Sequence, residues 1–450
     1  MTFDTIAAIA TAPGQGGVSI VRLSGPEAES ILMHIFAPAK STLTHLTSHM
    51  LTYGRAMDGD VPVDECMAVI MRAPRSYTRE DVCEIHLHGG HYACQKVLSL
   101  CLRHGARLAD PGEFTRRAFL NGRIDLSQAE AVMGLIAAQG ENAHRAALAQ
   151  LSGGASAFIR RAADTLYGIQ AGAAACIDYP EEISDEEAAG DLLPRIRALA
   201  DDLERACDER SARILRTGLN AALCGRPNVG KSSLLNALTG EEKAIVTAIP
   251  GTTRDVVQGE MLLGGTVIHL TDTAGLRDTE DVVEQIGVER ARKAVAQADA
   301  VLLVLDMSQR VQEEDLALLP ALFPERTAIL LNKSDLSPAI TPDDAARLLP
   351  GAQVMVISAH DERSLAPVKE FLLRMAAVTD NLTLTQPRHL EAARRAAEHL
   401  RSAAATIDVA TIDLCTVDLQ AAQLALAEIT GDQVEEKLLD KVFSEFCVGK

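Results

Sequence analysis

The chain has 450 residues, 47% of them hydrophobic and 23% charged, so its length and apolar content predict a globular protein of about three domains. Its 62 acidic residues outnumber its 43 basic ones and give a net charge of −19, which argues against a wholly basic nucleic-acid wrapper but leaves a local basic site open. No apolar run approaches the length of a membrane span, and the first residues lack the pattern of a secretory leader, so a cytoplasmic protein with no membrane partner is expected.

Residues 1–118 mix short β-branched runs with turns that contain Gly or Pro, which predicts an α+β domain with strands at residues 18–23, 68–71 and 82–87. The first 120 residues hold 11 basic and 12 acidic side chains, so nearly all of the negative charge of the chain lies after them. A site for an anion in this domain is therefore not excluded.

Residues 119–215 are rich in Ala, Leu, Glu and Gln, and their apolar residues recur at helical spacing, which predicts packed amphipathic helices. Six carboxylates between residues 178 and 187 indicate a solvated loop or a helix start within this block. Residues 379–450 have the same composition and spacing. The apolar faces of the two blocks are expected to pack together, which makes the segment between them an insertion.

Strands and helices alternate in residues 216–378, the pattern of a doubly wound α/β domain, with strands expected at 220–224, 267–271, 300–305, 327–331 and 353–357. The sequence Gly225-Arg226-Pro227-Asn228-Val229-Gly230-Lys231-Ser232 follows the first of these strands and precedes a helix, which is the setting of a phosphate-binding P-loop. Its N–H groups would surround the phosphates, Lys231 would reach the β and γ oxygens, and the Ser232 hydroxyl would take a Mg²⁺ position.

Three later motifs add to this nucleotide site. Asp272-Thr273-Ala274-Gly275 ends the second strand, where Asp272 can hold the Mg²⁺ shell and the Gly275 amide can meet the γ-phosphate. Asn332-Lys333-Ser334-Asp335 ends a later strand, and its last carboxylate can accept from N1 and N2 of guanine, a pair of donors that adenine does not offer. Ser358-Ala359 fits a loop that packs on the base. The order of these motifs predicts GTP as the ligand.

The segment Thr247-Ala248-Ile249-Pro250-Gly251-Thr252-Thr253 lies between the first two motifs and is expected to act as a switch over Mg²⁺ and the γ-phosphate. Leu276 stands where small GTPases that orient the attacking water with Gln carry that Gln. Hydrolysis is therefore expected to use another polar side chain, and a Glu-rich stretch follows at residues 278–289.

Two features allow more than one interpretation. His86, His88 and His91 form H-x-H-G-G-H, but no Cys or third ligand stands at zinc-finger spacing, so polar residues beside a turn are expected rather than a metal site. Cys447, close to Lys450, is either a reactive thiol activated by a nearby ammonium or a buried thiol in a docked terminal helix.

With the nucleotide motifs in place, the chain resembles the MnmE (TrmE) family of tRNA-modification GTPases from end to end. The nucleotide motifs alone would also fit ribosome-assembly GTPases, and the pieces that separate the two are Gly14-Gln15-Gly16-Gly17-Val18, Glu80-Asp81-Val82-Cys83-Glu84, His88-Gly89-Gly90, Pro111 to Asn121, Asp125-Leu126, Gln128-Ala129-Glu130-Ala131 and Phe446-Cys447-Val448-Gly449-Lys450.

The resemblance implies a multidomain fold that combines α+β, all-α and α/β parts. Its domains would be an N-terminal tetrahydrofolate-binding and dimerisation domain (1–118), a helical domain in two parts (119–215 and 379–450) and an inserted P-loop GTPase domain of the Ras-like TrmE-Era type (216–378). It also implies a homodimer.

The activity that the resemblance implies is K⁺-stimulated GTP hydrolysis coupled to tRNA modification. With the flavoprotein MnmG, which uses FAD and NADH, the chain would form a heterotetramer that adds a carboxymethylaminomethyl or aminomethyl group to C5 of the wobble uridine of certain tRNAs. The alternative is a GTP-switched ribosome-assembly or RNA-binding factor without modification chemistry of its own.

The resemblance also assigns residues by matching position. Arg22, Glu84, Arg123 and Lys450 would bind 5-formyltetrahydrofolate or a related tetrahydrofolate, although the family often has Lys where Arg123 stands, and Arg changes the contact geometry. Glu284 would position the attacking water through an intermediary, the alternative being one more solvent-facing acid of the acidic stretch, and Cys447 would be the catalytic thiol.

The implied metal ligands are Ser232 and Thr253 for Mg²⁺, and Asn228, Thr247, Ile249 and Thr252 for K⁺ in place of an arginine finger. The implied GTP contacts are Asn228, Val229, Gly230, Lys231, Ser232, Ser233, Thr247, Ala248, Ile249, Pro250, Gly251, Thr252, Thr253, Asp272, Thr273, Ala274, Gly275, Asn332, Lys333, Asp335, Ser358 and Ala359.

Overall fold

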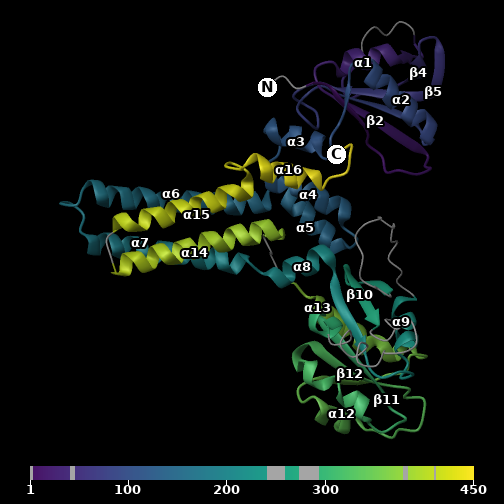
Figure 1. Cartoon of the computed structure of the whole chain (residues 1–450), viewed down its shortest axis with the longest axis vertical. Coiled ribbons are helices and arrows are strands. Elements are labelled where there is room, and N and C mark those ends of the chain that lie inside the picture. The colour runs from purple at the N-terminus through teal and green to yellow at the C-terminus, as the bar shows by residue number, and fades with distance from the viewer. Residues whose placement is uncertain (1–3, 41–45, 241–258, 273–292, 379–383, 410–411) are drawn as a thin grey trace, which may run out of the picture. The chain divides into compact units, whose positions relative to one another are not determined.

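A computed structural model of the chain (Figure 1) describes residues 4–40, 46–240, 259–272, 293–378, 384–409 and 412–450. The chain forms two compact units. The first unit comprises Met1–Met133, Gln150–Leu199 and Glu398–Lys450, and the second comprises Gly134–Ala149 and Ala200–Ala397. None of the described helices combines the length and the apolar character that crossing a bilayer requires.

The first unit begins with a seven-stranded sheet in the order β3-β4-β5-β6-β2-β1-β7, which is antiparallel except for the parallel pair β1 and β7. Its strands are β1 (Ile6–Ile9), β2 (Val18–Ser24), β3 (Phe36–Pro38), β4 (Thr52–Asp58), β5 (Val61–Met71), β6 (Val82–His88) and β7 (Arg107–Leu108). The expected strands at residues 18–23, 68–71 and 82–87 are therefore confirmed, and β1, β3, β4 and β7 were not expected.

One face of this sheet is covered by helices α1 (Ala28–Ile35) and α2 (His91–Arg103), and the other carries polar side chains beside a small buried apolar cluster of Ile6, Ala8, Ala109 and Phe114. Helices α1 and α2 share a buried apolar cluster with the sheet, to which Val21 and Ile85 contribute. Because side chains alternate along a strand, the half-buried Arg22 and Glu84, one residue away from these two, belong to the opposite face. The sheet thereby presents charged groups away from its helical layer.

The helical residues form long packed helices, as the apolar spacing predicts. In the first unit α6 packs along α15, and Arg197 of α7 pairs with Asp408 of α14 at 2.6 Å (Figure 1). The two helical blocks of the sequence therefore pack together, as expected. The acidic run covers the end of α6, a loop and the start of α7. The described helices of these blocks, with α3 before them, are α3 (Glu113–Leu120), α4 (Leu126–Ala137), α5 (Glu141–Leu151), α6 (Gly154–Asp178), α7 (Asp185–Ala206), α14 (Pro387–Val409), α15 (Ile412–Thr430) and α16 (Glu436–Ser444).

The second unit contains a six-stranded sheet in the order β13-β12-β11-β8-β10-β9. All neighbouring strands are parallel except β9 and β10, and the strands are β8 (Leu219–Cys224), β9 (Gly259–Leu263), β10 (Thr266–Asp272), β11 (Ala300–Asp306), β12 (Thr327–Asn332) and β13 (Gln353–Val356). The five expected strands are all present, and β9 is an addition at the edge of the sheet. This is the α/β architecture that the alternation of elements predicts.

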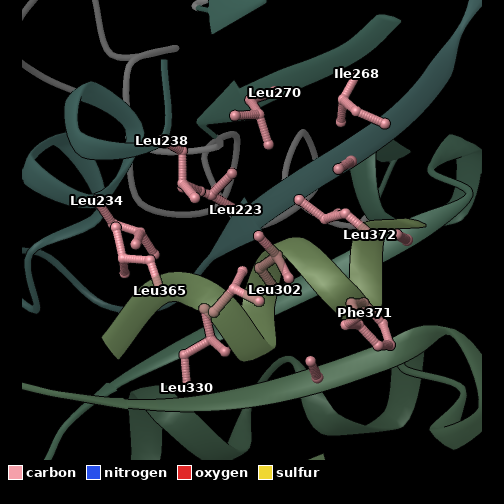
Figure 2. Packing of buried hydrophobic residues seen from close by; sticks show 14 of the residues in the cluster. Leu223, Leu234, Leu238, Ile268, Leu270, Leu302, Leu330, Leu365, Phe371 and Leu372 are labelled. Carbon is pink, nitrogen blue, oxygen red and sulfur yellow. The ribbon is translucent and has the colours of Figure 1, made fainter. Parts of the chain in front are cut away.

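Buried apolar residues cover both faces of this sheet. Leu302 and Val304 of β11 belong to one cluster, shown in Figure 2, while Val301 and Leu303 belong to another. A strand that is buried on both faces reads as a continuous apolar run, as β11 does. The covering elements are α8 (Glu209–Thr217), α9 (Lys231–Thr239), α11 (Glu313–Leu316), α12 (Pro342–Leu348), α13 (Ala366–Ala376) and short turns at Leu319–Ala321, Pro324–Arg326 and Glu362–Leu365.

Candidate nucleotide site and arginine cluster

The P-loop joins the end of β8 to the start of α9. Gly230 caps α9 with a φ of 99°, in the left-handed region, and an ideal Cβ built there would lie 2.3 Å from Asn332 Nδ2. Glycine is therefore required at this position by both backbone conformation and space. Asn228 is exposed on the loop and also has a positive φ, of 66°.

Lys231 begins α9, and its side chain is held over the P-loop. The residue is only 4% exposed, and Nζ donates to the carbonyl oxygens of Gly225 at 2.8 Å and Arg226 at 2.9 Å. These two bonds fix the ammonium beside the loop whose N–H groups would receive the phosphates. The position agrees with the phosphate-binding role that the motif predicts.

Ser232, in the first turn of α9, meets Asp272 at the end of β10. Asp272 ends β10, which pairs with β8, and Ser232 Oγ donates to Asp272 Oδ2 at 3.4 Å. Asp272 is buried and Ser232 is exposed. A hydroxyl and a carboxylate placed in this way are oxygen donors of the kind that Mg²⁺ prefers. The remaining residues of this motif, Thr273 to Gly275, lie outside the described part of the chain.

Asn332, at the end of β12, connects the P-loop to the loop at Ser358. The buried side chain donates from Nδ2 to the carbonyl of Val229 at 2.8 Å and accepts at Oδ1 from the amide of Ala359 at 3.1 Å. One amide group thus ties together three motifs that are far apart in the sequence. In this structure the Asn332 side chain holds the loop at Ser358 and Ala359 against the P-loop.

Asp335 is exposed on the next turn, where Ser358 Oγ donates to its Oδ1 at 2.9 Å. This single bond orients the carboxylate that the motif assigns to guanine recognition. Lys333 has a φ of 65°, and its Nζ lies 2.7 Å from Asp306 Oδ2. Burial of Asp306 opposes its ionisation, but hydrogen bonds from Lys333 and Ser308 outweigh this effect and hold the pKa of Asp306 below its usual value.

Several expected residues fall outside the described part of the chain. They are the switch residues Thr247, Ala248, Ile249, Pro250, Gly251, Thr252 and Thr253, the motif residues Thr273, Ala274 and Gly275, and Glu284. The described residues of the nucleotide site are Asn228 to Ser233, Asp272, Asn332, Lys333, Asp335, Ser358 and Ala359.

A second cluster, the arginine cluster, lies in the first unit around Arg22 and Glu84. These residues are direct cross-strand partners in the antiparallel pair β2 and β6, and Arg22 Nε donates to Glu84 Oε1 at 2.8 Å. Both side chains are less than one-fifth exposed, at 17% and 14%. The pair is thus largely desolvated, which strengthens the attraction between the charges but makes the loss of either partner costly.

Tyr77 joins Arg123 to this cluster. The guanidinium carbon of Arg123 lies 4.7 Å from the centre of the Tyr77 ring, and that of Arg22 lies 5.8 Å from the same ring. Arg123 Nη1 also donates to the carbonyl oxygen of Tyr77 at 2.9 Å. Two arginines therefore contact one aromatic ring, a cation–π arrangement that sequence reasoning did not find. No local pattern around Tyr77 signals it.

The C-terminal tail completes the cluster through its main chain. Arg22 Nη1 donates to the carbonyl of Gly449 at 3.2 Å, and the amide of Phe114 donates to the carbonyl of Lys450 at 3.0 Å. Gly449 has a φ of 96°, and a Cβ there would lie 2.3 Å from the carbonyl oxygen of Ile9.

Cys447 is exposed, so the interpretation that its thiol fills the core is wrong.

Two of the three histidines of the H-x-H-G-G-H motif, His86 and His88, contact carboxylates. His86 Nε2 lies 3.2 Å from Glu84 Oε2, and His88 Nδ1 lies 2.8 Å from Asp64 Oδ1. The hydrogen bond to Asp64 and the negative charge of Asp64 raise the pKa of His88. His86 is thus an unexpected neighbour of the arginine cluster, and strand alternation, which puts it on the face of Glu84, is the signal that could have found it.

Comparisons with known proteins cover the whole chain. A family model described as the N-terminus of the GTP-binding protein TrmE matches residues 5–123, and a model of the MnmE helical domain matches residues 126–447. The tRNA modification GTPase MnmE of Lactiplantibacillus plantarum is 42% identical over 100% of this chain and 99% of its own length. The proteins of the same name from Heliobacterium modesticaldum and Bacillus subtilis are 45% and 44% identical, over 100% and 99% of this chain and 100% of their own lengths.

Proposed function

The chain belongs to the MnmE family of tRNA modification GTPases, and we propose that its GTP hydrolysis is stimulated by K⁺ and drives modification of the wobble uridine of certain tRNAs. With the flavoprotein MnmG, it would add a carboxymethylaminomethyl or aminomethyl group to C5 of that base. One observation carries the proposal. The chain has both a nucleotide site, in which Asn332 contacts the P-loop, and an arginine cluster that contacts the C-terminal tail.

In the nucleotide site, different residues would bind the phosphates, the base and Mg²⁺. Lys231 would contact the β and γ oxygens, and the carboxylate of Asp335 would accept from N1 and N2 of guanine. Ser232 and Thr253 would hold Mg²⁺, with Asp272 in its outer shell, and the hydroxyl and carboxylate oxygens found at Ser232 and Asp272 fit this ion. The charge that Mg²⁺ supplies when bound offsets the negative charge of the phosphates.

K⁺ would be held by Asn228 together with Thr247, Ile249 and Thr252, and would supply charge that an arginine finger supplies in other GTPases. Asn228 is exposed on the P-loop, which suits a ligand to an ion that enters with the nucleotide. Glu284 would position the attacking water, because Leu276 stands where Gln does this in other GTPases. These assignments rest on the family, apart from the placement of Asn228.

The arginine cluster fits a tetrahydrofolate. A pterin ring offers an amino group and an adjacent N–H to a carboxylate, and Glu84 is a largely buried carboxylate whose position Arg22 and His86 fix. Arg123 and Lys450 would bind the acidic part of 5-formyltetrahydrofolate or a related compound. The folate would supply a one-carbon unit, and the exposed thiol of Cys447 would act in the transfer.

We further propose a homodimer, a heterotetramer with MnmG, which would bring FAD and NADH, and a cytoplasmic location. The chain would divide into a folate-binding and dimerisation domain at residues 1–118, a helical domain at 119–215 and 379–450, and a GTPase domain at 216–378. The alternative, a GTP-switched ribosome-assembly or RNA-binding factor, does not explain the Arg22–Glu84 pair or its contact with the tail.

The test of the hydrolytic mechanism is GTP turnover by the full chain in KCl and in NaCl at equal ionic strength. We expect turnover to depend on KCl, and Asn228→Ala to lower this stimulation with little loss of GTP binding, because Lys231 and main-chain N–H groups hold the phosphates. Equal rates in the two salts would exclude the K⁺ mechanism.

The test of the cellular role is nucleoside analysis of tRNA after depletion of the protein. Loss of the C5 group from wobble uridine, with normal ribosomal particles, is the expected result. Immature ribosomal particles with fully modified uridine would support the assembly factor instead.

A further inference from the structure

A hollow of about 530 Å³ lies beside the arginine cluster in the first unit. It is lined by His49, Met71, Pro74, Arg75, Ser76, Tyr77, Arg79 and Arg123. Three of the lining side chains are arginines, and none of the lining residues carries a carboxylate. In a chain where acids outnumber bases by 62 to 43, a hollow of this composition attracts an anion.

Among the residues that the structure describes, none forms an ion pair with Arg75, Arg79 or Arg123. Arg79 Nη1 donates to the carbonyl oxygen of Asn121 at 3.0 Å, and Arg123 donates to that of Tyr77, so both bonds hold the guanidinium groups without cancelling their charge. Arg75 is exposed, and within the described part of the chain its side chain has no hydrogen-bond or ion-pair partner. Like charges gathered without acids repel one another, and a bound anion would relieve that repulsion.

The backbone around the hollow is held in an uncommon conformation. Arg79 has a φ of 61° and His49 a φ of 64°, and both lie in the left-handed region that side chains other than Gly and Asn rarely adopt. The amide of His49 donates to the carbonyl of Ile70 at 2.7 Å, which ties this residue to the end of β5. Strain of this kind at two residues of one hollow is typical of a binding site.

The hollow shares Tyr77 and Arg123 with the proposed folate site. This residue lines the hollow, and its ring contacts both Arg123, which also lines the hollow, and Arg22, which pairs with Glu84. A ligand whose ring contacted Glu84 and whose tail passed Tyr77 would therefore reach the hollow.

From these shared residues, and on the basis of the folate site proposed above, we infer that the hollow binds the γ-linked oligoglutamate tail of the folate. Each γ-linked glutamate adds one carboxylate to the tail, and a guanidinium binds a carboxylate through two parallel hydrogen bonds. Arg75 and Arg79 bind these added carboxylates, while Arg123 binds the first glutamate. The chain therefore selects folates with several glutamates over the monoglutamate form.

The test is titration calorimetry of the full chain with 5-formyltetrahydrofolate in its monoglutamate and triglutamate forms, at one fixed ionic strength. We expect the triglutamate to bind at least about tenfold more tightly, since a hydrogen bond to a charged group contributes this much or more. The double variant Arg75→Gln/Arg79→Gln should lose this gain and keep the affinity for the monoglutamate. A matched control is Arg55→Gln/Arg103→Gln, which removes two exposed arginines of the same sheet region that pair with Glu65 and Asp58.

The outcomes separate this inference from the folate site itself. Equal affinity of the wild-type chain for the two forms, or a gain that the double variant retains, overturns the role of the hollow while leaving the folate site intact. Loss of tRNA binding in the double variant, with both folate affinities unchanged, assigns the hollow to RNA and also overturns it. If neither form binds the wild-type chain, the folate site itself is wrong.

Discussion

The nucleotide site and the arginine cluster are built in different ways. In the nucleotide site, loops at the ends of parallel strands supply the groups, and main-chain atoms of Gly225, Arg226 and Val229 take part in the bonds that shape it. In the arginine cluster, side chains meet on the face of the sheet that lies opposite α1 and α2, and strand register sets their spacing. The first site therefore depends on backbone conformation, and the second on side-chain charge and on distant segments that dock on the sheet.

This difference predicts how each region fails. In the nucleotide site, a substitution that adds a single methyl group can abolish GTP binding without removing a charged group. Apart from Gly449, where a Cβ would collide with the carbonyl oxygen of Ile9, the arginine cluster should tolerate small changes in volume. It should fail when one charged partner is removed, because its other partner is left largely buried. The two regions should therefore respond to separate sets of variants, each with little effect on the other.

The largest effect is expected for Arg117→Ala, which removes a buried guanidinium group from α3 in the first unit. Arg117 is 2% exposed and pairs with Asp4, Glu80 and Glu113 at 2.9–3.2 Å, from the same helix that carries Phe114 to the tail. Leaving these carboxylates without it should cost about 3–5 kcal/mol of local stability. Hydrogen exchange followed by mass spectrometry should show faster exchange in β2 and β6 but not in β8 and β11, and uniform protection would contradict this.

The next largest effect is expected for Gly230→Ala in the nucleotide site. The methyl group would collide with Asn332 Nδ2, and the backbone conformation at φ 99° is strained for alanine, so GTP affinity should fall about 100-fold. Fluorescent GTP titration measures this loss, and folate affinity should not change. The control is Gly190→Ala, where an added methyl group meets no atom within 4 Å. Normal GTP binding by Gly230→Ala would show that the loop adapts.

A smaller effect is expected for Arg22→Gln, and it should concern folate binding instead of GTP binding. It leaves Glu84 with His86 alone among its described ion-pair partners, and removes the bond to Gly449, so folate affinity should fall about tenfold. GTP binding and turnover should be unchanged, which calorimetry and a phosphate-release assay can check. Arg55→Gln, which breaks an exposed ion pair with Glu65 in the same sheet, is the control. A parallel loss of GTP binding would mean that the two regions are not independent.

The smallest effect is expected for Glu113→Gln, which should reduce the loss of folding stability at low pH. Burial opposes ionisation of Glu113, but hydrogen bonds from Arg107, Asp110 and Arg117 outweigh this effect and hold the pKa of Glu113 below its usual value. Glu113 therefore adds stability above about pH 4.5, its ordinary value, and this stability is lost as the pH falls through the lower folded value. Urea unfolding followed by circular dichroism should show a smaller drop between pH 7 and pH 3.5 in Glu113→Gln than in the wild-type chain.

The two regions also differ in how far the sequence predicts them. The nucleotide motifs are contiguous, and each follows an apolar strand, so their order was enough to predict that Asp272, Asn332 and Ser358 come together. Periodicity does not reveal which strands pair, so Arg22 and Glu84 could be joined only through family resemblance, and Tyr77 was missed. Strand β1 and the edge strand β9 were missed because each is only four or five residues long and lacks a clear alternating pattern. The role of Asn332 as a tie to Val229 depends on a contact between loops that no local rule contains.

Reconstituted modification of tRNA by the Cys447→Ser variant tests most directly whether the two regions serve one reaction. The full chain, the flavoprotein partner, GTP, KCl and a tetrahydrofolate are combined with unmodified tRNA, and nucleosides are quantified by mass spectrometry. We expect GTP turnover near that of the wild-type chain and no modified wobble uridine, because the hydroxyl of serine is a much weaker nucleophile than a cysteine thiolate. Full modification by this variant, at an unchanged melting temperature, would contradict a chemical role for the tail beside Arg22.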